Sequence, residues 1–313
     1  MAASKYVFGV DIGGTNLRVA LADAAGTILA RTLSTTTDVR DPQLIVEKIR
    51  QSADQLLRDT GVQAETIAAI GVGAPGVTNA ETGVVIATSY LLGWRDVPLK
   101  AMLEEALHLP AAVDNDVNLA ALGESFFGTA MGAPNFVFLA VGTGVGAGII
   151  LKGELFQGAE WSAGEVGYML VPGVPELPAE VGKPGALESM VGGEGLRQQW
   201  LSMWNPEHTN LPKNLTATQI FDNAVAGDAL ANALLDQAAN TLACAIFNIA
   251  LILNTPLFVL GGSVGLHSAL CDRTQNIVDA HARGFRPQVV LSSLGSDAQL
   301  MGAIRLAQLT AAR

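Results

Sequence analysis

A local pattern of strand, glycine turn and strand occurs twice in the 313 residues, and it constrains the fold more than any other feature of the sequence. In the first copy, a β-rich run over residues 6–11 precedes the turn at Gly13-Gly14, which carries Thr15, and residues 17–21 continue as a strand. The second copy has its strand, its glycine-dense turn and its next strand at residues 136–141, 142–148 and 149–151. A repeated supersecondary unit predicts two similar halves, and a cleft between them is the expected ligand site.

Each half continues with helices that alternate with strands. The helices are recognised by apolar residues at helical spacing, and the strands by short apolar runs that glycine or proline ends. In the first half, helices are expected at residues 43–57, 99–107 and 117–127, and strands at residues 27–33, 67–72 and 111–113. In the second half, helices are expected at residues 194–204, 217–226, 229–253 and 298–311, and strands at residues 257–260 and 288–291. This alternation predicts an α/β fold.

The length supports a division into two lobes. A chain of 313 residues is about twice the roughly 150 residues of an average domain. We expect an N-terminal α/β lobe over residues 1–118 and a larger C-terminal α/β lobe over residues 119–295. A C-terminal helix over residues 296–313 is expected to pack back on the N-terminal lobe.

Composition and charge exclude several classes of protein. Half of the residues are hydrophobic and 15% are charged, which predicts packed cores rather than disorder. The net charge is -11 and no run of Lys or Arg occurs, so nucleic acid is a poor partner. Cys244 and Cys271 are too few for a disulfide framework, which fits a reducing compartment. The apolar stretch at residues 243–260 is interrupted by two asparagines and Pro256, so a buried helix and strand are expected rather than a membrane span, in a cytoplasmic protein.

The first glycine turn has the residues of a phosphate site. Without Cβ atoms, Gly13 and Gly14 let the chain curl so that backbone N–H groups point at an anion. Asp11 at the end of the strand could hold Mg²⁺ directly or through water, while Thr15 and Asn16 add donors. The alternative is a Gly-Gly β-turn in which the Asp side chain bonds its own backbone.

The second glycine turn favours the phosphate interpretation, because two Thr-bearing turns, one in each half, can clamp a triphosphate. Residues 142–147 also fit the dinucleotide pattern G-x-G-x-x-A, and residues 71–76 fit G-x-G-x-x-G. A Rossmann site requires a helix to begin inside the motif, whereas Pro75 and a turn follow the earlier motif and a strand follows the later one. We therefore expect no NAD site. A P-loop is also excluded, since G-x-x-x-x-G-K-[ST] does not occur in the sequence.

Further motifs run through the chain: Gly73-Ala74-Pro75-Gly76, Asn115-Asp116-Val117-Asn118, Gly164-Glu165-Val166-Gly167, Ala186-Leu187-Glu188 and Leu260-Gly261-Gly262-Ser263. Together with the two glycine turns, and in the same order, they resemble the motifs of the ROK family of bacterial sugar kinases and repressors, within the actin-like ATPase clan. As a set these motifs are highly specific, and they cover nearly the whole chain. The resemblance implies a two-lobed actin-like ATPase (ribonuclease H-like) fold with duplicated βββαβαβα domains around a cleft.

The resemblance also implies roles for individual residues. Asp116 matches the catalytic base, which takes the proton of a sugar hydroxyl as its oxygen attacks the γ-phosphorus of ATP. The positions expected to bind the sugar are Gly76, Asn115, Asp116, Glu165, Tyr168 and Glu188. The positions expected to bind the nucleotide or its metal are Asp11, Gly13, Gly14, Thr15, Asn16, Gly142, Thr143, Gly144, Gly146, Gly261, Gly262 and Ser263.

The residue types agree with this chemistry but leave an alternative open. Phosphoryl transfer needs positioning, charge neutralisation and a carboxylate near the nucleophilic oxygen. Taken alone, Asp114-Asn115-Asp116 could instead be the N-cap of the helix expected at residues 117–127, and Glu165 could be a solvated acid in a loop.

Three positions depart from the family pattern. Tyr168 stands where the resemblance places a histidine that binds both zinc and sugar, and residues 181–186 lack the family's Cys-x-Cys-Gly-x-x-Gly-Cys run. We therefore expect no structural zinc. Tyr90 stands where an asparagine often precedes the leucine at Leu91.

The resulting hypothesis is an enzyme with ATP and Mg²⁺ as cofactors. It would phosphorylate a hexose, glucose-like, at the primary 6-hydroxyl by direct in-line γ-phosphoryl transfer with an Asp general base. Alternatives are an N-acetylhexosamine kinase, a fructose kinase or a catalytically weak sugar-binding member of the family. A sugar-sensing repressor is disfavoured, because such members carry an N-terminal helix-turn-helix and only five residues precede the first expected strand here. The expected partners are a small sugar, ATP and a second copy in a homodimer, with no nucleic acid and no membrane.

Overall fold

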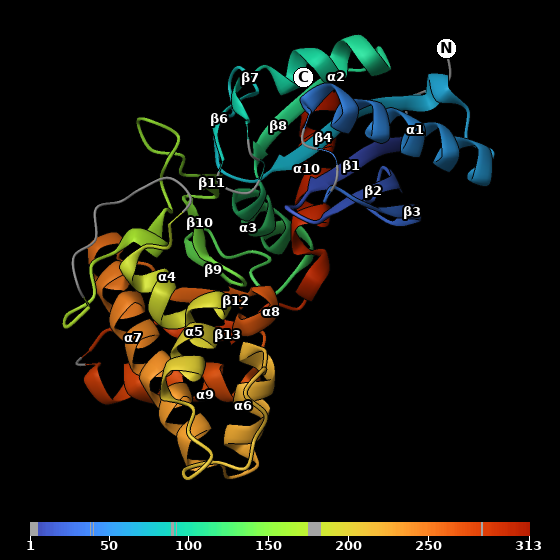
Figure 1. The fold of residues 1–313 in the computed structure, drawn as a ribbon. Helices are drawn as coiled ribbons and strands as arrows, with labels where there is room; N and C mark the ends of the chain where they lie inside the picture. The colour runs from blue at the N-terminus through green and yellow to red at the C-terminus, as the bar shows by residue number, and fades with distance from the viewer. Residues whose placement is uncertain are drawn as a thin grey trace. The chain divides into compact units, whose positions relative to one another are not determined.

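The computed structural model describes residues 6–37, 39, 41–88, 91, 93–174, 183–282 and 284–313 (Figure 1). Contacts within the chain divide it into two compact units. Unit 1 comprises Met1–Gly128, Leu155–Ala163 and Asp297–Arg313, and unit 2 comprises Thr129–Glu154 and Gly164–Ser296. The boundary expected after residue 118 falls inside a helix, α3 (Asp116–Phe127), which remains whole in unit 1.

The main sheet of unit 1 has five strands in the order β3-β2-β1-β4-β8. These strands are β1 (Tyr6–Ile12), β2 (Asn16–Asp23), β3 (Ile28–Thr35), β4 (Ile67–Ala74) and β8 (Ala111–Asn115). The strands β1, β2 and β3 pair antiparallel, whereas β1, β4 and β8 pair parallel. The parallel register puts Asp11 opposite Gly73 and Gly73 opposite Asp114. The carboxyl ends of three strands therefore meet at one edge of the sheet.

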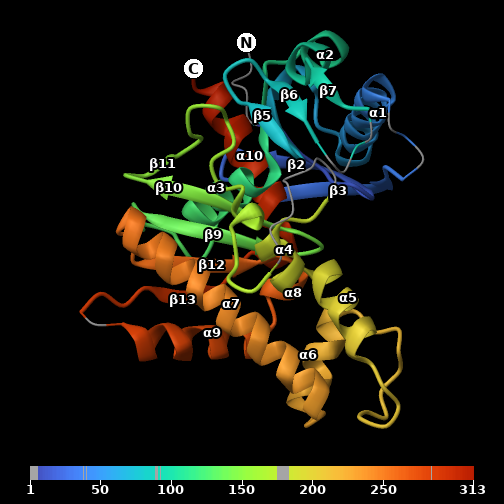
Figure 2. The ribbon, with the colours of Figure 1, turned by 60° about the vertical axis from the view of Figure 1, so that its left-hand side comes forward.

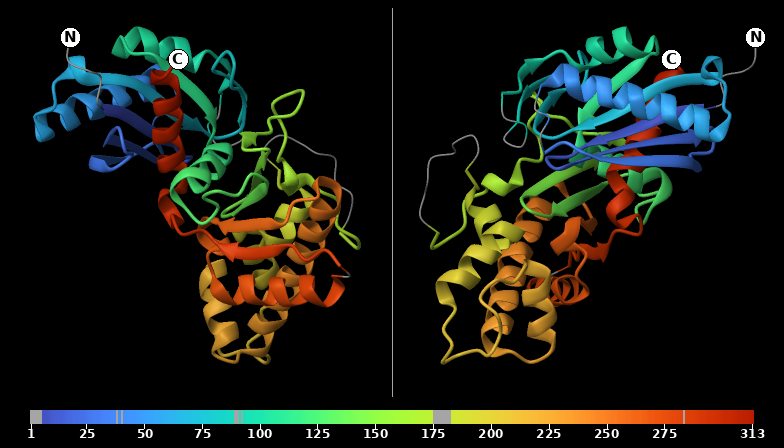
Figure 3. Two further views of the ribbon diagram at one scale, coloured as in Figure 1. Left: turned by 180° about the vertical axis from the view of Figure 1, so that it is seen from behind. Right: turned by 45° about the vertical axis from the view of Figure 1, so that its right-hand side comes forward.

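Helices cover both faces of this sheet (Figure 3). On one face, α1 (Pro42–Thr60) and α2 (Leu99–Leu107) bury residues such as Ile49 and Leu103 in the core of the unit. On the other face, α10 (Ala298–Ala311) packs on β1 and β4 through Leu300 and Ile304, beside α3. The remaining elements of the unit are η1 (Ala64–Thr66) and the small antiparallel sheet of β5 (Val77–Asn79), β6 (Val84–Ala87) and β7 (Arg95–Val97).

The sheet of unit 2 has the order β11-β10-β9-β12-β13 (Figure 2). Its strands are β9 (Phe136–Val141), β10 (Val145–Leu151), β11 (Glu154–Leu155), β12 (Leu257–Gly261) and β13 (Gln288–Leu291). As in unit 1, an antiparallel hairpin, here β9 and β10, is followed across the sheet by two parallel strands, β12 and β13. This common order confirms the duplication predicted from the repeated sequence pattern.

The helices of unit 2 differ from those of unit 1 in number and length. They are η2 (Val166–Tyr168), α4 (Ala186–Val191), α5 (Gly193–Met203), α6 (Ala217–Val225), α7 (Ala229–Leu253), α8 (Gly262–Gly265) and α9 (Ser268–His281), with η3 (Gly295–Asp297) leading into α10. One expectation is corrected: the second glycine turn does not extend over residues 142–148. The strand β10 begins at Val145, so Gly146 and Gly148 lie inside the hairpin ladder, where Gly146 pairs with Ala140.

The helix α7 is the one element of the described residues that is long and apolar enough to cross a membrane. Half of its most apolar window is buried within the protein, against strand residues such as Leu139, Phe258 and Leu260. The apolar stretch at residues 243–260 thus forms the end of a core helix followed by β12, as its sequence predicted.

Glycines allow α10 to approach the rest of unit 1 closely. A Cβ on Gly71 of β4 would lie 2.1 Å from the carbonyl oxygen of Ala303, and one on Gly302 would lie 1.7 Å from the carbonyl oxygen of Leu119 in α3. Both distances are shorter than any van der Waals contact, so only glycine permits this packing. The position of α10, and through it of α3, depends on these two residues.

We expect Gly302→Ala to destabilise the protein by about 1–3 kcal/mol, the usual cost of overpacking a core. The sign is informative, because alanine in a helix is otherwise favoured over glycine by about 1 kcal/mol. Urea denaturation followed by circular dichroism would measure the change. An increase in the free energy of unfolding would contradict the packing argument.

Candidate active site

The carboxyl edge of the unit 1 sheet gathers several of the predicted residues. Asp11 is the second-to-last residue of β1, and its neighbour across the sheet is Gly73 of β4. A Cβ on Gly73 would lie 3.5 Å from the Cα of Asp116, so the first residue of α3 lies close to the same point. The structure therefore brings Asp11 and Asp116 to the two sides of one glycine.

Asp11 is buried and binds Arg18. The Nη2 and Nε atoms of Arg18 lie 2.8 Å and 2.9 Å from Oδ2 of Asp11. Burial raises the pKa of Asp11 above its usual value, and the charge of Arg18 offsets part of the shift. Arg18 also faces Asp297 at 3.5 Å, and Arg31 binds Asp297 at 3.0 Å.

Arg18 is a site residue that the sequence analysis missed, although a signal for it was present. Asp11 and Arg18 are direct partners across the β1–β2 hairpin. Counting outward from the Gly13-Gly14 turn would have placed them opposite each other. No comparable count would have found Asp297, which is distant in sequence.

The first glycine turn is held by hydrogen bonds from its own hairpin and from the end of β3. The N–H of Gly13 donates to the carbonyl of Asn16 at 2.7 Å. Thr36 donates from Oγ1 to the carbonyl of Gly13 at 2.9 Å and from its N–H to the carbonyl of Thr15 at 3.0 Å. The side chains of Thr15 and Asn16 are exposed. A turn whose carbonyls are bound from one side has a fixed shape in which N–H groups can serve an anion.

Asn115 is the N-cap of α3. Its Oδ1 accepts hydrogen bonds from the N–H groups of Val117 at 2.8 Å and Asn118 at 3.1 Å. Its Nδ2 donates to the carbonyl of Gly76 at 2.9 Å. Gly76 has φ +92°, and a Cβ there would lie 2.2 Å from a backbone carbonyl of β6. Asn115 thus joins the start of α3 to a turn that requires glycine.

Asp116 is the first residue of α3 and is half-buried. Its Oδ1 accepts from the N–H of Val117 at 3.0 Å. The amino end of a helix carries partial positive charge, which favours an ionised carboxylate at this position. Capping, which the sequence left open for Asp114-Asn115-Asp116, is performed by Asn115, and Asp116 lies in the first turn.

Asp114 is buried next to these residues, and all three of its hydrogen-bond partners donate. Oδ1 accepts from the N–H of Asn115 at 2.7 Å and from Nδ2 of Asn118 at 3.0 Å. Oδ2 accepts from Nε2 of Gln157 at 2.8 Å. Burial raises the pKa of Asp114, and the donors offset part of this shift. Gln157 was not predicted, since no pattern in the sequence marks its loop.

In unit 2, the second glycine turn packs against the start of α5. The carbonyl of Gly142 accepts from the N–H of Gly193 at 2.7 Å, and the carbonyl of Thr143 accepts from the N–H of Glu194 at 3.3 Å. Gly262, with φ +81°, completes this cluster, since a Cβ on it would lie 2.9 Å from the backbone nitrogen of Gly142. The structure therefore brings together the turns at Gly142 and Gly262, which were predicted to bind the nucleotide.

Glu165, Tyr168 and Glu188 gather elsewhere in unit 2, around η2 and the start of α4. Glu188 accepts from the N–H of Val145 at 2.9 Å. Although Glu165 is exposed to solvent, desolvation by the surrounding chain raises its pKa, and the nearby charge of Glu188 raises it further. The pKa of Glu188 is also raised by burial, while the bond from Val145 offsets part of the shift. Burial and the two carboxylates likewise raise the pKa of Tyr168.

These residues form a pair of acids and a phenol on rigid backbone. Gly167 allows the approach, because a Cβ there would lie 2.6 Å from the carbonyl of Val145. Two carboxylates can accept several hydroxyl donors each, which is the chemistry that a sugar offers. The hydroxyl of Tyr168, whose side chain is 38% exposed, can add one donor or acceptor.

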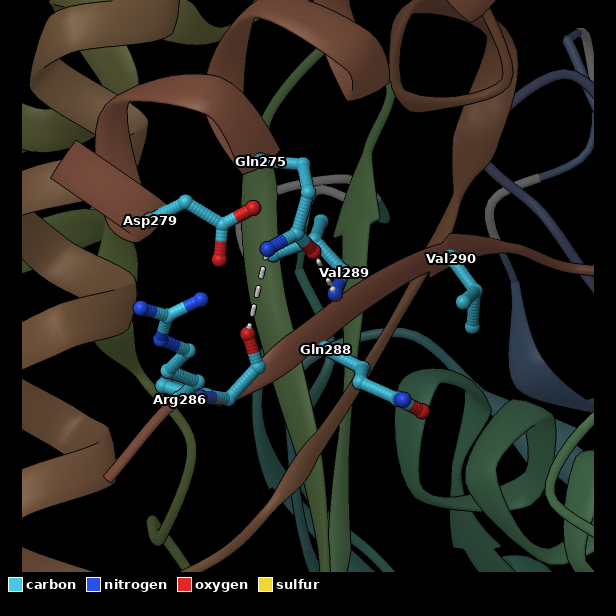
Figure 4. A pocket seen from close by; sticks show the side chains of 7 residues that line it. Gln275, Asp279, Arg286, Gln288, Val289 and Val290 are labelled. Atoms are coloured by element: carbon cyan, nitrogen blue, oxygen red, sulfur yellow. Dashed lines mark hydrogen bonds between the residues drawn. The ribbon is translucent and has the colours of Figure 1, made fainter. Parts of the chain in front are cut away.

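A cavity of about 450 Å³ lies elsewhere in unit 2, between α9 and β13 (Figure 4). Its lining residues are Gln275, Asp279, Arg286, Pro287, Gln288, Val289 and Val290, and none of them is a predicted site residue. The amide of Gln275 binds the edge strand, accepting from the N–H of Val289 at 2.6 Å and donating to the carbonyl of Pro287 at 3.4 Å. Gln275 thereby occupies edge groups of β13 that would otherwise be open to another strand.

Two sequence expectations concern parts of the chain that the structure describes incompletely. Tyr90 lies outside the described residues, as do residues 181 and 182 of the segment 181–186 that lacks the family's cysteine run. Within the ranges that are described, no group of three or more His, Cys, Asp or Glu side chains could hold a metal ion.

The fold of this chain is similar to that of solved sugar kinases. A ROK family glucokinase from Streptomyces griseus, solved in complex with glucose and AMPPNP, superimposes with a TM-score of 0.81 at 27% identity and covers 97% of this chain and 99% of its own. The fold is that of the actin-like ATPases, as the sequence predicted.

The profile of the ROK family matches residues 7–310, and the chain belongs to this family. A glucokinase from Halalkalibacterium halodurans is 33% identical and aligns over 96% of this chain and 94% of its own length. An N-acetyl-D-glucosamine kinase from Yersinia pseudotuberculosis is 28% identical over 88% of this chain and 89% of its own. The resemblance read from the motifs is thereby confirmed.

We expect Glu165→Gln to increase the free energy of unfolding at about pH 7, by a few tenths to about 1 kcal/mol for this exposed side chain. The raised pKa of Glu165 means that the folded state binds its proton more tightly than the unfolded state does. That contribution is fully present below the unfolded pKa and is lost as the pH rises through the folded pKa. The gain from glutamine should therefore shrink as the pH falls towards about 4.

Glu194→Gln is a matched control with the opposite sign. Arg197 lies 2.6 Å from Glu194 and lowers its pKa to about 2, so removing this charge should slightly destabilise the protein at neutral pH. Denaturation curves at both pH values would measure both variants. Equal effects of the two substitutions would contradict the raised pKa of Glu165.

Proposed function

We propose that this ROK family protein is an ATP-dependent sugar kinase that transfers the γ-phosphoryl group of ATP to the primary 6-hydroxyl of a glucose-like hexose. The observation that carries the proposal is the position of Asp116, the first residue of α3. It lies beside Gly73 at the same sheet edge as Asp11, which is near the end of β1. The sugar kinases among its relatives support the same reaction class.

In this proposal Asp116 is the general base. Its carboxylate accepts the proton of the sugar hydroxyl while the hydroxyl oxygen forms its bond to the γ-phosphorus and the bond from that phosphorus to the bridging oxygen of ADP breaks. The partial positive charge of the helix amino end favours the ionised carboxylate, which is the form that a base needs before it accepts a proton. Asn115 fixes the turn that carries Asp116 through the Gly76 carbonyl, and the second hydrogen of its amide would donate to a sugar hydroxyl.

The glycine turns are assigned to the phosphates of the nucleotide. The turn at residues 13–16, the turn at residues 142–144 and the turn at residues 261–263 would offer backbone N–H and hydroxyl donors to the phosphates, and Gly146 follows the second of these turns in β10. Asp11 supplies a carboxylate oxygen, the ligand type that Mg²⁺ prefers, and both contacts from Arg18 go to Oδ2 alone. When bound, Mg²⁺ would neutralise phosphate charge.

The sugar is assigned to Gly76, Asn115, Glu165, Tyr168 and Glu188. Desolvation raises the pKa of both Glu165 and Glu188, and the charge of Glu188 adds to the shift of Glu165; hydroxyl donors would relieve this cost. At the position of the family's histidine, whose smaller ring has two polar atoms, Tyr168 has a larger ring with one hydroxyl. N-acetylhexosamine and fructose therefore remain the alternative substrates. The N-acetyl-D-glucosamine kinase among the relatives favours the former.

Three further properties belong to the proposal. With Tyr168 at the position of the zinc-binding histidine, the protein is expected to hold no structural zinc, and elemental analysis finding about one zinc per chain would refute this. We also propose that the protein acts in the cytoplasm and forms a homodimer, as the family resemblance implies.

The substitution Asp116→Asn tests the reaction. The amide keeps the shape and hydrogen bonding of the side chain but cannot accept the proton, so turnover should fall by about 10²- to 10⁴-fold. Binding of the sugar, measured by calorimetry, should be retained. An assay of ADP release with a panel of hexoses, hexosamines and ketoses gives the rates. Near-normal turnover in the variant would reject Asp116 as the base.

The substitution Tyr168→His tests the sugar site. We expect the natural protein to be less selective for the substituents at the anomeric or 2-position of the sugar, because a single phenol hydroxyl replaces the two ring nitrogens of a histidine. The same panel should therefore show a changed rank order of sugars in the variant, with the Michaelis constant for ATP unaltered. An unchanged rank order would mean that Tyr168 does not face the sugar.

A further inference from the structure

The segment Leu155–Ala163 belongs to unit 1, although the chain before and after it belongs to unit 2. It forms a closed loop, since the N–H of Ala163 donates to the carbonyl of Gln157 at 3.3 Å. Leu155 packs against Leu119 of α3. The side chain of Gln157 reaches Asp114 at the end of β8. One residue thus closes the loop through its backbone and attaches the loop to unit 1 through its amide.

The attachment acts on the buried carboxylate of Asp114, two residues before the proposed base. Asp114 is 2% exposed, and its Oδ1 binds the backbone N–H of Asn115 and the side chain of Asn118. These two residues flank Asp116 in the sequence. Oδ2 has Gln157 as its partner, at 2.8 Å. Without Gln157, a buried carboxylate oxygen would lose its donor, and such a group is costly to leave unsatisfied.

Rotation of Asp114 towards another donor would break its bonds to Asn115, which precedes Asp116, and to Asn118, which follows it by two residues. The N–H of Asn118 is also capped by Oδ1 of Asn115, so the first turn of α3 forms one connected network. Networks of this kind rigidify a site only while every member is satisfied.

We propose that Gln157 is a positioning residue for phosphoryl transfer: by binding Asp114, it holds Asn115 and Asp116 in their geometry at the start of α3. The proposal rests on the function proposed above, because it assumes that Asp116 acts as the base. Gln157 itself does not act on the substrate in this assignment. It acts through Asp114.

The donor pattern allows a reciprocal exchange of side chains. Gln157→Glu places a carboxylate against the carboxylate of Asp114 and removes the donor. In the double variant Asp114→Asn with Gln157→Glu, Oδ1 of the asparagine can accept from Asn115 and Asn118 while its Nδ2 donates to the new glutamate. The single variant Asp114→Asn should lower kcat only mildly, since the amide of Gln157 can turn to present its oxygen to the new amide. Gln63→Glu is the matched control, because Gln63 makes an exposed bond to the carbonyl of Gly61.

We expect Gln157→Glu to lower kcat by about 10- to 100-fold, the range for one hydrogen bond to a charged group, with the Michaelis constant for ATP within about twofold of normal. The double variant should recover kcat to within about threefold of the unaltered protein, and Gln63→Glu should leave it unchanged. A normal kcat in Gln157→Glu, or a double variant as slow as Gln157→Glu, would overturn the proposal. Gln157→Met, which keeps the length but has no donor, replaces Gln157→Glu if the latter does not fold.

Amide hydrogen exchange at residues 115–118 and 157–163 provides a readout that does not depend on activity. Exchange should be faster in Gln157→Glu and should return to the rate of the unaltered protein in the double variant. The thermal midpoint of Gln63→Glu should stay normal. If the unaltered protein phosphorylates no sugar, the proposed function fails, and exchange alone then decides whether Gln157 fixes this turn. Unchanged protection in Gln157→Glu would refute the positioning role.

Discussion

The parallel register of β1, β4 and β8 is the constraint on which the chemistry of unit 1 depends. It aligns Asp11, Gly73 and Asp114 in one row across the sheet. Because carboxyl ends of parallel strands meet at one edge, the loops that follow them converge there without any further device. Gly73 leaves room between the flanking strands, and the first turn of α3 uses it. The packing of α10 through Gly71 and Gly302 then fixes α3 against the sheet.

The two units treat their acidic groups differently. In unit 1, Asp11 has the guanidinium of Arg18, and Asp114 has three N–H donors. In unit 2, desolvation raises the pKa of both Glu165 and Glu188, and the charge of Glu188 raises that of Glu165 further. Unfavourable electrostatics of this kind persist in proteins mainly at functional sites, where a ligand supplies the missing donors. A polyhydroxylated ligand fits that requirement better than an anion does.

The duplicated hairpin also shows how one local pattern is stabilised in two ways. In unit 1, Thr36 binds the carbonyls of the glycine turn. In unit 2, the first N–H groups of α5 bind the equivalent carbonyls. In both arrangements the groups whose orientation is fixed are backbone dipoles and not lysine side chains. This agrees with the net charge of -11 and the lack of a P-loop lysine.

The sequence by itself determined the fold class, the duplication and the family, because glycine turns and apolar periodicity are local signals that recur in register along the chain. It also located the capping turn at residues 114–116 and the pair of acids at Glu165 and Glu188. It did not determine that α3 stays whole in unit 1, nor the roles of Arg18, Asp297 and Gln157. Arg18 follows from hairpin pairing, but Asp297 and Gln157 reach their partners across 279 and 43 residues of chain. Only tertiary packing decides such contacts, since a hydrogen bond between distant segments leaves no periodicity in the sequence.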